Sequence, residues 1–264
     1  MEEKIRHARE NDIPAMKSLW SECFPNDKEY ADFFFENIFR LASARVCEIE
    51  GECAAMIHVF PRMIATPFCE LSAKYIYGVG TTEKCRGKGI AGRMLEAEAN
   101  DCDLLVLIPQ SESLFDFYKK YGFSEICEVS KREVYAEEKA ENRPATESDI
   151  PYINSVYERC LSDYLYAKRD AKTWKLLMDE YEFLGGGFMV FDGGYCAYYR
   201  ENGEVFVTEF FAEKKDTVLG SLSEKYTLTT KGCGKRLAVI RPVSDKAKAV
   251  LDKQKMRYIN LMHN

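Results

Sequence analysis

Two spacings of hydrophobic residues alternate along the chain, and together they predict a mixture of helices and strands. Apolar residues that recur about every 3.6 positions are typical of helices, and runs of β-branched and aromatic residues between turn residues are typical of strands. In the first half, the expected helices cover residues 13–23, 29–41, 90–100 and 114–121. The expected strands there cover residues 4–8, 45–50, 53–63, 74–81, 104–108 and 124–135.

The second half shows a similar order of elements. Its expected helices cover residues 150–161, 172–181, 217–225 and 245–253. Its expected strands cover residues 188–191, 194–201, 204–211, 236–240 and 258–262. The polar segment AEEKAENRP, residues 136–144, separates the two halves and is expected to be a linker.

A short sequence occurs twice in the chain. Seven of sixteen positions are identical between ARENDIPAMKSLWSEC, from Ala8, and ATESDIPYINSVYERC, from Ala145. Unrelated segments of average composition would share roughly one. Two similar helix starts would explain the acids and the proline in a first turn, but the likeness continues beyond that turn. We therefore expect a duplicated α/β (α+β) unit, with domains at residues 1–138 and 139–264.

Composition narrows the class of protein. The net charge of −6 argues against a general nucleic-acid-binding protein, which would carry a basic surface. The longest aliphatic run, LLVLI at residues 104–108, is far too short to span a membrane. The ten cysteines stand singly with no CxxC, and there are only three histidines, so no metal site is expected. The start MEEKIRHARE contains no apolar signal segment, which favours a reducing, cytoplasmic location.

The segment CRGKGIAGRMLEAEA, residues 85–99, places glycines and two cations directly before a predicted helix. The unpaired N–H groups and positive dipole end of a helix N-terminus favour an anion, and glycines let backbone amides curve around it. An exposed turn with solvated charges would use the same residue types. GKGIAG, residues 87–92, also fits the dinucleotide-binding pattern GxGxxG, but that pattern belongs after the first strand of its unit. No GxxxxGK[ST] sequence is present, which disfavours a P-loop nucleotidase.

The longer segment YIYGVGTTEKCRGKGIAGRML resembles the central motif of the GNAT superfamily of acyl-CoA-dependent N-acyltransferases. Its pattern [Q/R]-x-x-G-x-[G/A] is matched by Arg86, Gly89 and Ala91. SLFDFYKKYGF, residues 113–123, is similar to the next motif of the same family, and the resemblance covers about residues 4–136. It implies two tandem GNAT-like units, each a mixed, mostly antiparallel sheet flanked by helices.

The resemblance also implies a function and a site. The function is that of an N-acetyltransferase that transfers an acetyl group from acetyl-CoA to a primary amine of a small molecule or peptide. Tyr118 is implied as the general acid that protonates the departing thiolate. The pantetheine arm is assigned to a splayed strand and the pyrophosphate to the glycine loop. The implied cofactor-binding residues are Val79, Gly80, Thr81, Arg86, Gly87, Lys88, Gly89, Ile90, Ala91, Gly92 and Ser113.

Several assignments stay open at this point. Glu70, His58 and the C-terminal carboxylate of Asn264 are all candidates for the general base. His58 and Tyr118 also fit ordinary core positions, because each lies in an apolar element. An alternative function is a non-catalytic acyl-CoA-binding regulatory module, which needs the cofactor residues but not Tyr118. The sequence specifies no oligomeric state.

The second half resembles the same fold without its phosphate cradle. After the strand EVFVTEFF it reads AEKKDTVLGSLSEKY, with no glycine pair before the predicted helix. Two such units in tandem look like the enhanced-intracellular-survival type of acetyltransferase, although the chain is too short to hold the third domain of that type. We therefore expect one cofactor per chain, bound by the first half.

Overall fold

The computed structural model describes residues 3–135, 141–212 and 222–261, which form two compact units. Unit 1 consists of Met1–Met63, Leu71–Glu125 and Val239–Lys253. Unit 2 consists of Ile64–Glu70, Ile126–Ala238 and Gln254–Asn264. The expected halves, 1–138 and 139–264, do not coincide with these units, because each unit contains stretches from both halves. The boundary near residue 138 is expected to separate the two copies of a duplicated sequence, and in that sense it stays a prediction.

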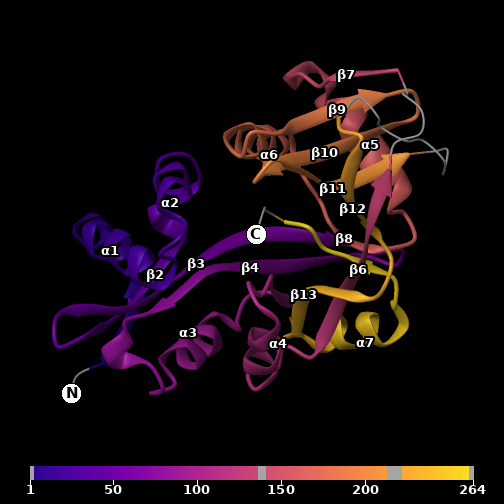
Figure 1. Ribbon diagram of the computed structural model, residues 1–264. Helices are drawn as coiled ribbons and strands as arrows, with labels where there is room; N and C mark the ends of the chain where they lie inside the picture. The colour runs from indigo at the N-terminus through magenta and orange to yellow at the C-terminus, as the bar shows by residue number, and fades with distance from the viewer. Residues whose placement is uncertain (1–2, 136–140, 213–221, 262–264) are drawn as a thin grey trace. The chain divides into compact units, whose positions relative to one another are not determined.

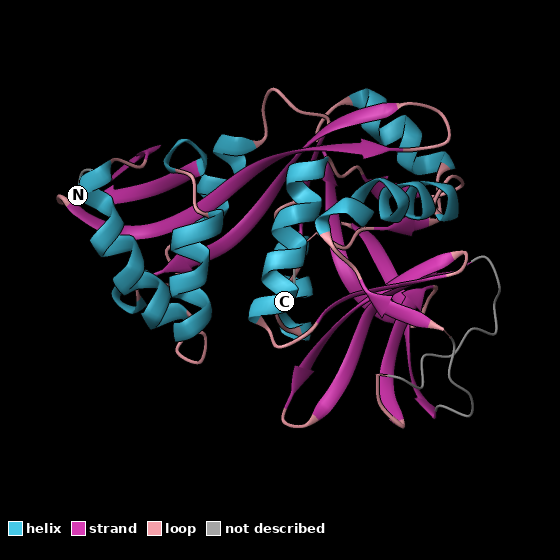
Figure 2. Cartoon of the chain, turned by 90° about the horizontal axis from the view of Figure 1, so that it is seen from above, coloured by secondary structure: helices cyan, strands magenta, loops and turns pink. Residues whose placement is uncertain are grey.

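A mixed sheet forms the centre of unit 1. Its strands are, in spatial order, β1 (Glu3–His7), β2 (Ala44–Ile49), β3 (Glu52–Ala65), β4 (Glu70–Thr81), β5 (Leu104–Leu107) and the end of β13 (Lys235–Pro242). β1, β2 and β3 pair antiparallel, β4 pairs parallel with β5, and β5 pairs antiparallel with β13. Seen from above, β3 and β4 run side by side as two long strands (Figure 2).

Helices cover both faces of this sheet. α1 (Ile13–Cys23) and α2 (Lys28–Phe33) lie on one face, and α3 (Ile90–Glu98) and α4 (Glu112–Lys119) lie on the other (Figure 1). α7 (Asp245–Lys253) lies on the same face as α4. One core cluster joins β3 and β5 to α3 and α4 through buried residues that include Ile57, Leu105, Ile90, Met94 and Phe115. Burial of such side chains is the main favourable contribution to folding.

Unit 2 is also built from paired strands with helices packed against them. Its strands are, in spatial order, β6 (Glu125–Tyr135), β12 (Lys225–Lys231), β11 (Glu204–Ala212), β10 (Gly194–Glu201), β9 (Gly187–Phe191) and β7 (Asn142–Pro144). The short strands β8 (Leu165–Ala167) and β14 (Arg257–Tyr258) pair with each other. α5 (Ile150–Cys160) and α6 (Ala171–Phe183) pack on an aromatic core formed by Tyr157, Trp174, Tyr195, Phe211 and Tyr258.

The two copies of the repeated sequence fold alike. Each begins with a 3-10 turn, Glu10–Asp12 or Glu147–Asp149, and continues directly into a helix. Arg6 donates to both carboxylate oxygens of Asp12 at 2.6 and 2.9 Å. Arg143 donates to Asp149 in the same way at 2.8 and 2.6 Å. The duplication therefore includes the strand before the helix as well as the helix itself.

Three expectations about single elements need correction. The strand expected at residues 258–262 is only the two-residue strand β14, and residues 259–261 belong to no helix or strand. The expected helix 29–41 is α2 followed by a π-helical turn, Phe34–Ile38, and a 3-10 turn, Leu41–Ser43. Of the expected helix 217–225, residues 217–221 lie outside the described residues, and Lys225 begins strand β12. The alternation of KYTLTTK is typical of such a strand. The strands expected at 124–135 and 236–240 are present as β6 and β13. However, β5 pairs with β13 and β12 pairs with β6, so the halves exchange these strands.

Membrane spans, metal clusters and disulfides are each expected to be absent, and the described residues bear on all three. Of the helices within residues 3–135, 141–212 and 222–261, none is long and apolar enough to cross a lipid bilayer. The same ranges contain no group of three or more histidine, cysteine or acidic side chains that could hold a metal ion. All ten cysteines are free thiols.

Candidate active site

The end of strand β4 separates from its neighbour β5. The parallel pairing of these strands consists of Ala73 with Leu104, Lys74 with Leu105 and Tyr75 with Val106. The remaining residues of β4, from Ile76 to Thr81, continue beyond this pairing. Val79, Gly80 and Thr81, which the sequence assigns to the pantetheine arm, all lie on this tail. A strand end that has left its neighbour can offer its backbone to an extended ligand.

The glycine loop follows directly and ends at the N-terminus of α3. Gly87 and Gly89 both have φ of +74°, and Gly89 is the residue before the first helical position, Ile90. Left-handed backbone costs little only for glycine, which explains both residues. Arg86 and Lys88 are exposed beside this turn. The loop therefore combines helix N–H groups with two cations, and this is the arrangement expected for a phosphate site.

Side chains fix the position of this loop. Arg93, on the first turn of α3, donates to the Lys88 carbonyl at 2.9 Å and forms a two-pronged ion pair with Glu3 at 2.7 Å. The Arg86 guanidinium donates to the Thr81 carbonyl at 3.1 Å, which ties the start of the loop to the end of β4. These contacts hold the strand tail and the helix start in one arrangement before any ligand is bound.

Three predicted residues of the motif helix lie at different depths. The Ile90 side chain is buried in the core of unit 1, so only its backbone is available to a ligand. Ala91 is partly buried and Gly92 is fully enclosed. A Cβ at Gly92 would lie 2.1 Å from the Tyr121 ring. The close approach that the glycine suggested is therefore explained by Tyr121, and a contact of Gly92 with the cofactor stays a prediction.

The second motif places Tyr118 and Ser113 on α4. Tyr118 belongs to the buried core cluster of unit 1, with the Phe117 and Phe123 rings 5.1 and 5.8 Å away. Burial raises the pKa of the Tyr118 phenol well above its ordinary value, so the group carries its proton throughout the physiological range. Ser113 is exposed, and its hydroxyl lies 3.1 Å from that of Ser111 at the start of the helix.

The three candidates for the general base have different surroundings. Glu70, at the opposite end of β4 from Gly80, forms an ion pair with Lys168 at 2.6 Å. Ten strand residues separate it from Gly80, a distance of about 30 Å. Asn264 lies outside the described residues. His58 is completely buried in β3, but unlike an ordinary core histidine it has no hydrogen-bond partner on either ring nitrogen.

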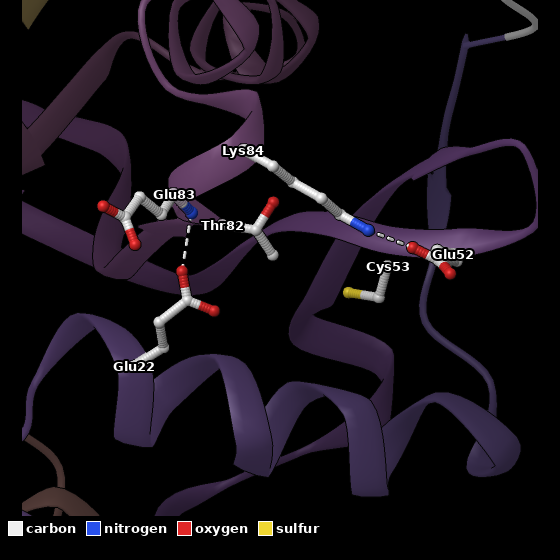
Figure 3. A pocket seen from close by; sticks show the side chains of 6 residues that line it. All are labelled: Glu22, Glu52, Cys53, Thr82, Glu83 and Lys84. Carbon is white, nitrogen blue, oxygen red and sulfur yellow. Dashed lines mark hydrogen bonds and ion pairs between the residues drawn. The ribbon is translucent and has the colours of Figure 1, made fainter.

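An acidic pocket of about 550 Å³ lies beside the loop (Figure 3). Its lining residues are Glu22, Glu52, Cys53, Thr82, Glu83 and Lys84. Glu22 accepts a hydrogen bond from the Glu83 backbone N–H at 2.6 Å, and Lys84 pairs with Glu52. Three carboxylates against one ammonium make this pocket a poor site for the phosphates of CoA. A neighbouring pocket of about 360 Å³ reaches Cys85 and Lys88.

Unit 2 contains a strand tail like that of β4, but its surroundings are filled by side chains. β11 pairs in parallel with β12 at Phe206 and Val207 and then continues. The next inward side chain, Glu209, accepts from Arg169 at 2.6 and 2.9 Å and from Tyr195 at 3.0 Å. The Arg169 guanidinium also lies 4.4 and 4.5 Å from the Tyr157 and Trp174 ring centroids. A buried ion pair therefore fills the space beside this strand tail in unit 2.

The separated strand end, the glycine turn at a helix N-terminus and the tyrosine of the next helix lie in the segments that resemble the two GNAT motifs. Residues 4–126 match the sequence model of the acetyltransferase (GNAT) domain, and the chain carries this domain there. Domains of this family use acetyl-CoA as the acetyl donor. Among curated proteins, none matches the sequence.

Solved structures extend the similarity to both halves of the chain. A GCN5-related N-acetyltransferase from Kribbella flavida is 11% identical, with a TM-score of 0.70 over 93% of this chain and 72% of that one. A probable N-acyltransferase from Enterococcus faecalis V583 is 13% identical, with a TM-score of 0.70 over 94% and 74%. Eis1 from Mycobacterium abscessus is 11% identical, with a TM-score of 0.67 over 95% and 76%. The chain thus has the fold of these proteins, including the tandem arrangement expected from the repeat.

Proposed function

We propose that unit 1 binds acetyl-CoA and transfers its acetyl group to a primary amine of a small molecule or a peptide. The observation that carries this proposal is the junction of the β4 tail with the glycine loop. The tail offers its backbone to the pantetheine arm, and the loop offers amides and the cations of Arg86 and Lys88 to the pyrophosphate. Both parts are held in place by Arg86 and Arg93 without a ligand.

The chemistry assigned to the chain is acid–base and positional. The neutral amine nitrogen attacks the thioester carbonyl carbon, the C–N bond forms, the nitrogen releases one proton to a base, and the C–S bond breaks. The electron pair of that bond leaves with sulfur, which takes a proton from the Tyr118 phenol. A backbone N–H near Val79 polarises the acetyl carbonyl, because a fixed donor stabilises the charge that develops on its oxygen. Binding both reactants on one strand supplies the orientation that the reaction needs.

Acetyl-CoA is expected to raise the thermal stability of the protein, because a ligand that binds only the folded state stabilises it. At a hundredfold excess over Kd the stabilisation is about 2.7 kcal/mol. Calorimetry should find one CoA per chain, since the sequence of the second half has no glycine pair before the helix expected after Phe211. NAD and ATP serve as comparison ligands. A larger increase in thermal stability with NAD than with acetyl-CoA would favour a dinucleotide site instead. Two CoA molecules per chain would contradict the expectation that unit 2 binds none.

Gly87→Ala is expected to weaken acetyl-CoA binding, and Gly203→Ala is its matched control. Both glycines have left-handed backbone, with φ of +74° and +80°, and a Cβ at either position would have no neighbour within 4 Å. Each substitution should therefore cost about 1–2 kcal/mol of stability through backbone strain alone. If the Gly87 turn forms the anion cradle, only Gly87→Ala should also weaken binding, by about tenfold for roughly 1.4 kcal/mol of lost contacts. Equal affinities of the two variants in calorimetry would contradict the assignment.

A further inference from the structure

His58 lies at the centre of an aromatic cluster on the α1 and α2 face of the unit 1 sheet. The Phe34, Phe39 and Trp20 ring centroids lie 4.9, 5.8 and 5.9 Å from that of His58, and Phe35 lies at 6.3 Å. His58 and Phe34 are fully buried, whereas Phe35 and Phe39 are only partly buried. Phe35 and Phe39 are therefore the members of this cluster that lie nearest to solvent.

Polar atoms at the centre of this cluster lack hydrogen-bond partners. Within the described part of the chain, no hydrogen bond of normal geometry reaches either ring nitrogen of His58 or the buried indole N–H of Trp20, although the Tyr77 backbone lies near the imidazole. Leaving a buried donor or acceptor unpaired costs about 1–3 kcal/mol. Such groups are rare in native proteins, and a ligand that supplies the partner accounts for them. The cluster thus retains polar atoms that an ordinary apolar core would have replaced.

The location of these atoms links them to the strand tail of the site. Gly78 has φ of +56°, and a Cβ there would lie 2.9 Å from both His58 Nδ1 and the Trp20 ring. Gly78 is the residue directly before Val79, whose backbone is assigned to the acetyl carbonyl. Only a residue without a side chain lets the tail approach the imidazole so closely. His58 is therefore the polar side chain on the α1 and α2 side of the tail at this point.

The segment that carries the phenylalanines has an unusual backbone. Phe34–Ile38 forms a π-helical turn, and the Phe39 N–H donates to the Phe34 carbonyl at 2.8 Å across five residues. π-helical turns are rare, and they occur frequently at functional sites. This turn positions Phe34, Phe35 and Phe39 around His58.

We propose that His58 is a catalytic residue that accepts the proton released by the acceptor amine, and that the acceptor carries its amino group on an apolar or aromatic body. As the C–N bond forms, one N–H proton moves from the amine to an imidazole nitrogen of His58, while the sulfur takes the Tyr118 proton. The imidazolium then gives its proton to water and Tyr118 regains one from water, so the net change is amide and thiol from amine and thioester. This inference rests on the proposed function.

The surroundings of His58 suit this role. Burial lowers the pKa of His58 to about 3, despite the nearby backbone of Tyr77, so the imidazole is neutral and able to accept a proton at physiological pH. The same burial disfavours the ammonium form of an amine that enters the cluster, which keeps the nucleophile neutral. The nitrogen loses its proton readily only after it has attacked the carbonyl, so the imidazole has to accept the proton only at that stage. The rings would contact the apolar body of the acceptor.

Kinetics of His58→Phe and His58→Gln test the role of the imidazole. Both variants remove the base, and the first also removes the unpaired nitrogens, so it should fold and bind acetyl-CoA as well as the unmodified protein. We expect kcat for an apolar amine to fall by about a hundredfold in both, at the lower end of the usual range for acid–base catalysis. His7→Phe and His7→Gln, at an exposed histidine on β1, are the matched controls. Unchanged kcat in a His58 variant that binds acetyl-CoA would overturn the inference.

A second measurement needs no turnover. With CoA bound in place of acetyl-CoA, titration with benzylamine should shift the imidazole ¹⁵N resonances of His58 in a saturable way and leave those of His7 unchanged. Ethanolamine should produce a smaller shift, because it has no apolar body. Unmoved His58 resonances with benzylamine and other apolar amines would overturn the inference while one CoA per chain still binds. Failure of CoA to bind at all would instead remove the proposed function itself, and the inference with it.

Discussion

Tyr118→Phe is expected to lower kcat for acetyl transfer by about 10²–10⁴-fold while leaving the affinity for acetyl-CoA nearly unchanged. The substitution removes one hydroxyl and keeps the ring, which packs against Phe117 and Phe123 in the core of unit 1. Stability should therefore change little. The phosphates are assigned to Arg86–Gly92, away from the hydroxyl, so the loss should fall on proton transfer to sulfur. Steady-state kinetics and calorimetry of the same preparation measure both quantities.

The control for this substitution is Tyr121→Phe, which removes a hydroxyl from a tyrosine whose ring packs against Gly92 in the same region. It should leave kcat within a factor of a few of the unmodified protein. If Tyr118→Phe also turns over normally, Tyr118 has no part in the mechanism and is a core residue. If the unmodified protein binds acetyl-CoA tightly but acetylates no amine in a broad panel, the non-catalytic regulatory module becomes the better description.

Arg169→Met is expected to destabilise the protein by about 3–5 kcal/mol, because it leaves the carboxylate of Glu209 buried without its cation. The side chains of both residues are almost completely enclosed, with 3% and 2% exposure. Arg169 also donates to the Asn260 carbonyl at 2.7 Å and lies between the Tyr157 and Trp174 rings, so no single replacement restores its contacts. Urea denaturation followed by tryptophan fluorescence measures the loss, since Trp174 is part of this cluster.

Lys175→Met is the matched control for this prediction. It removes the cation of an exposed pair with Asp179 on the surface of α6, and such pairs contribute about 0–1 kcal/mol. The double variant Arg169→Met with Glu209→Leu should cost less than the sum of its single variants, because neither charge is then left alone. A loss below about 1 kcal/mol for Arg169→Met would show that the network adds little to stability.

Most helices and strands, and the glycine loop, could be predicted from the sequence, because neighbouring residues in the chain determine them. The glycines at 87 and 89 are required by left-handed backbone, and the helix after them has the expected apolar spacing. The repeat at Ala8 and Ala145 predicted two units with the same helix start, and the paired Arg6–Asp12 and Arg143–Asp149 contacts confirm that likeness. Propensity and spacing determine such features within a few residues of chain.

Features that depend on distant residues were not readable in this way. The exchange of β6 and β13 could not be predicted, because a strand pattern shows that a strand forms but not which strand it pairs with. The residues around Gly92 do not indicate that the Tyr121 ring fills the space beside this glycine. His58 looked like a core histidine, and only the three-dimensional surroundings show that its nitrogens are unpaired. In each case the decisive neighbour lies far away in sequence.

The exchange of strands also determines when the protein can fold during its synthesis. Unit 1 needs Val239–Lys253 for its last strand and helix, so nearly the whole chain must leave the ribosome before that unit is complete. Until then the buried strand Leu104–Leu107 has an open edge, which is a template for wrong pairing with other chains. A domain that was complete in one stretch could fold while the next was still being made. Here neither unit has all its parts until residues after Val239 have been made, so nascent chains depend on protection of that edge until then.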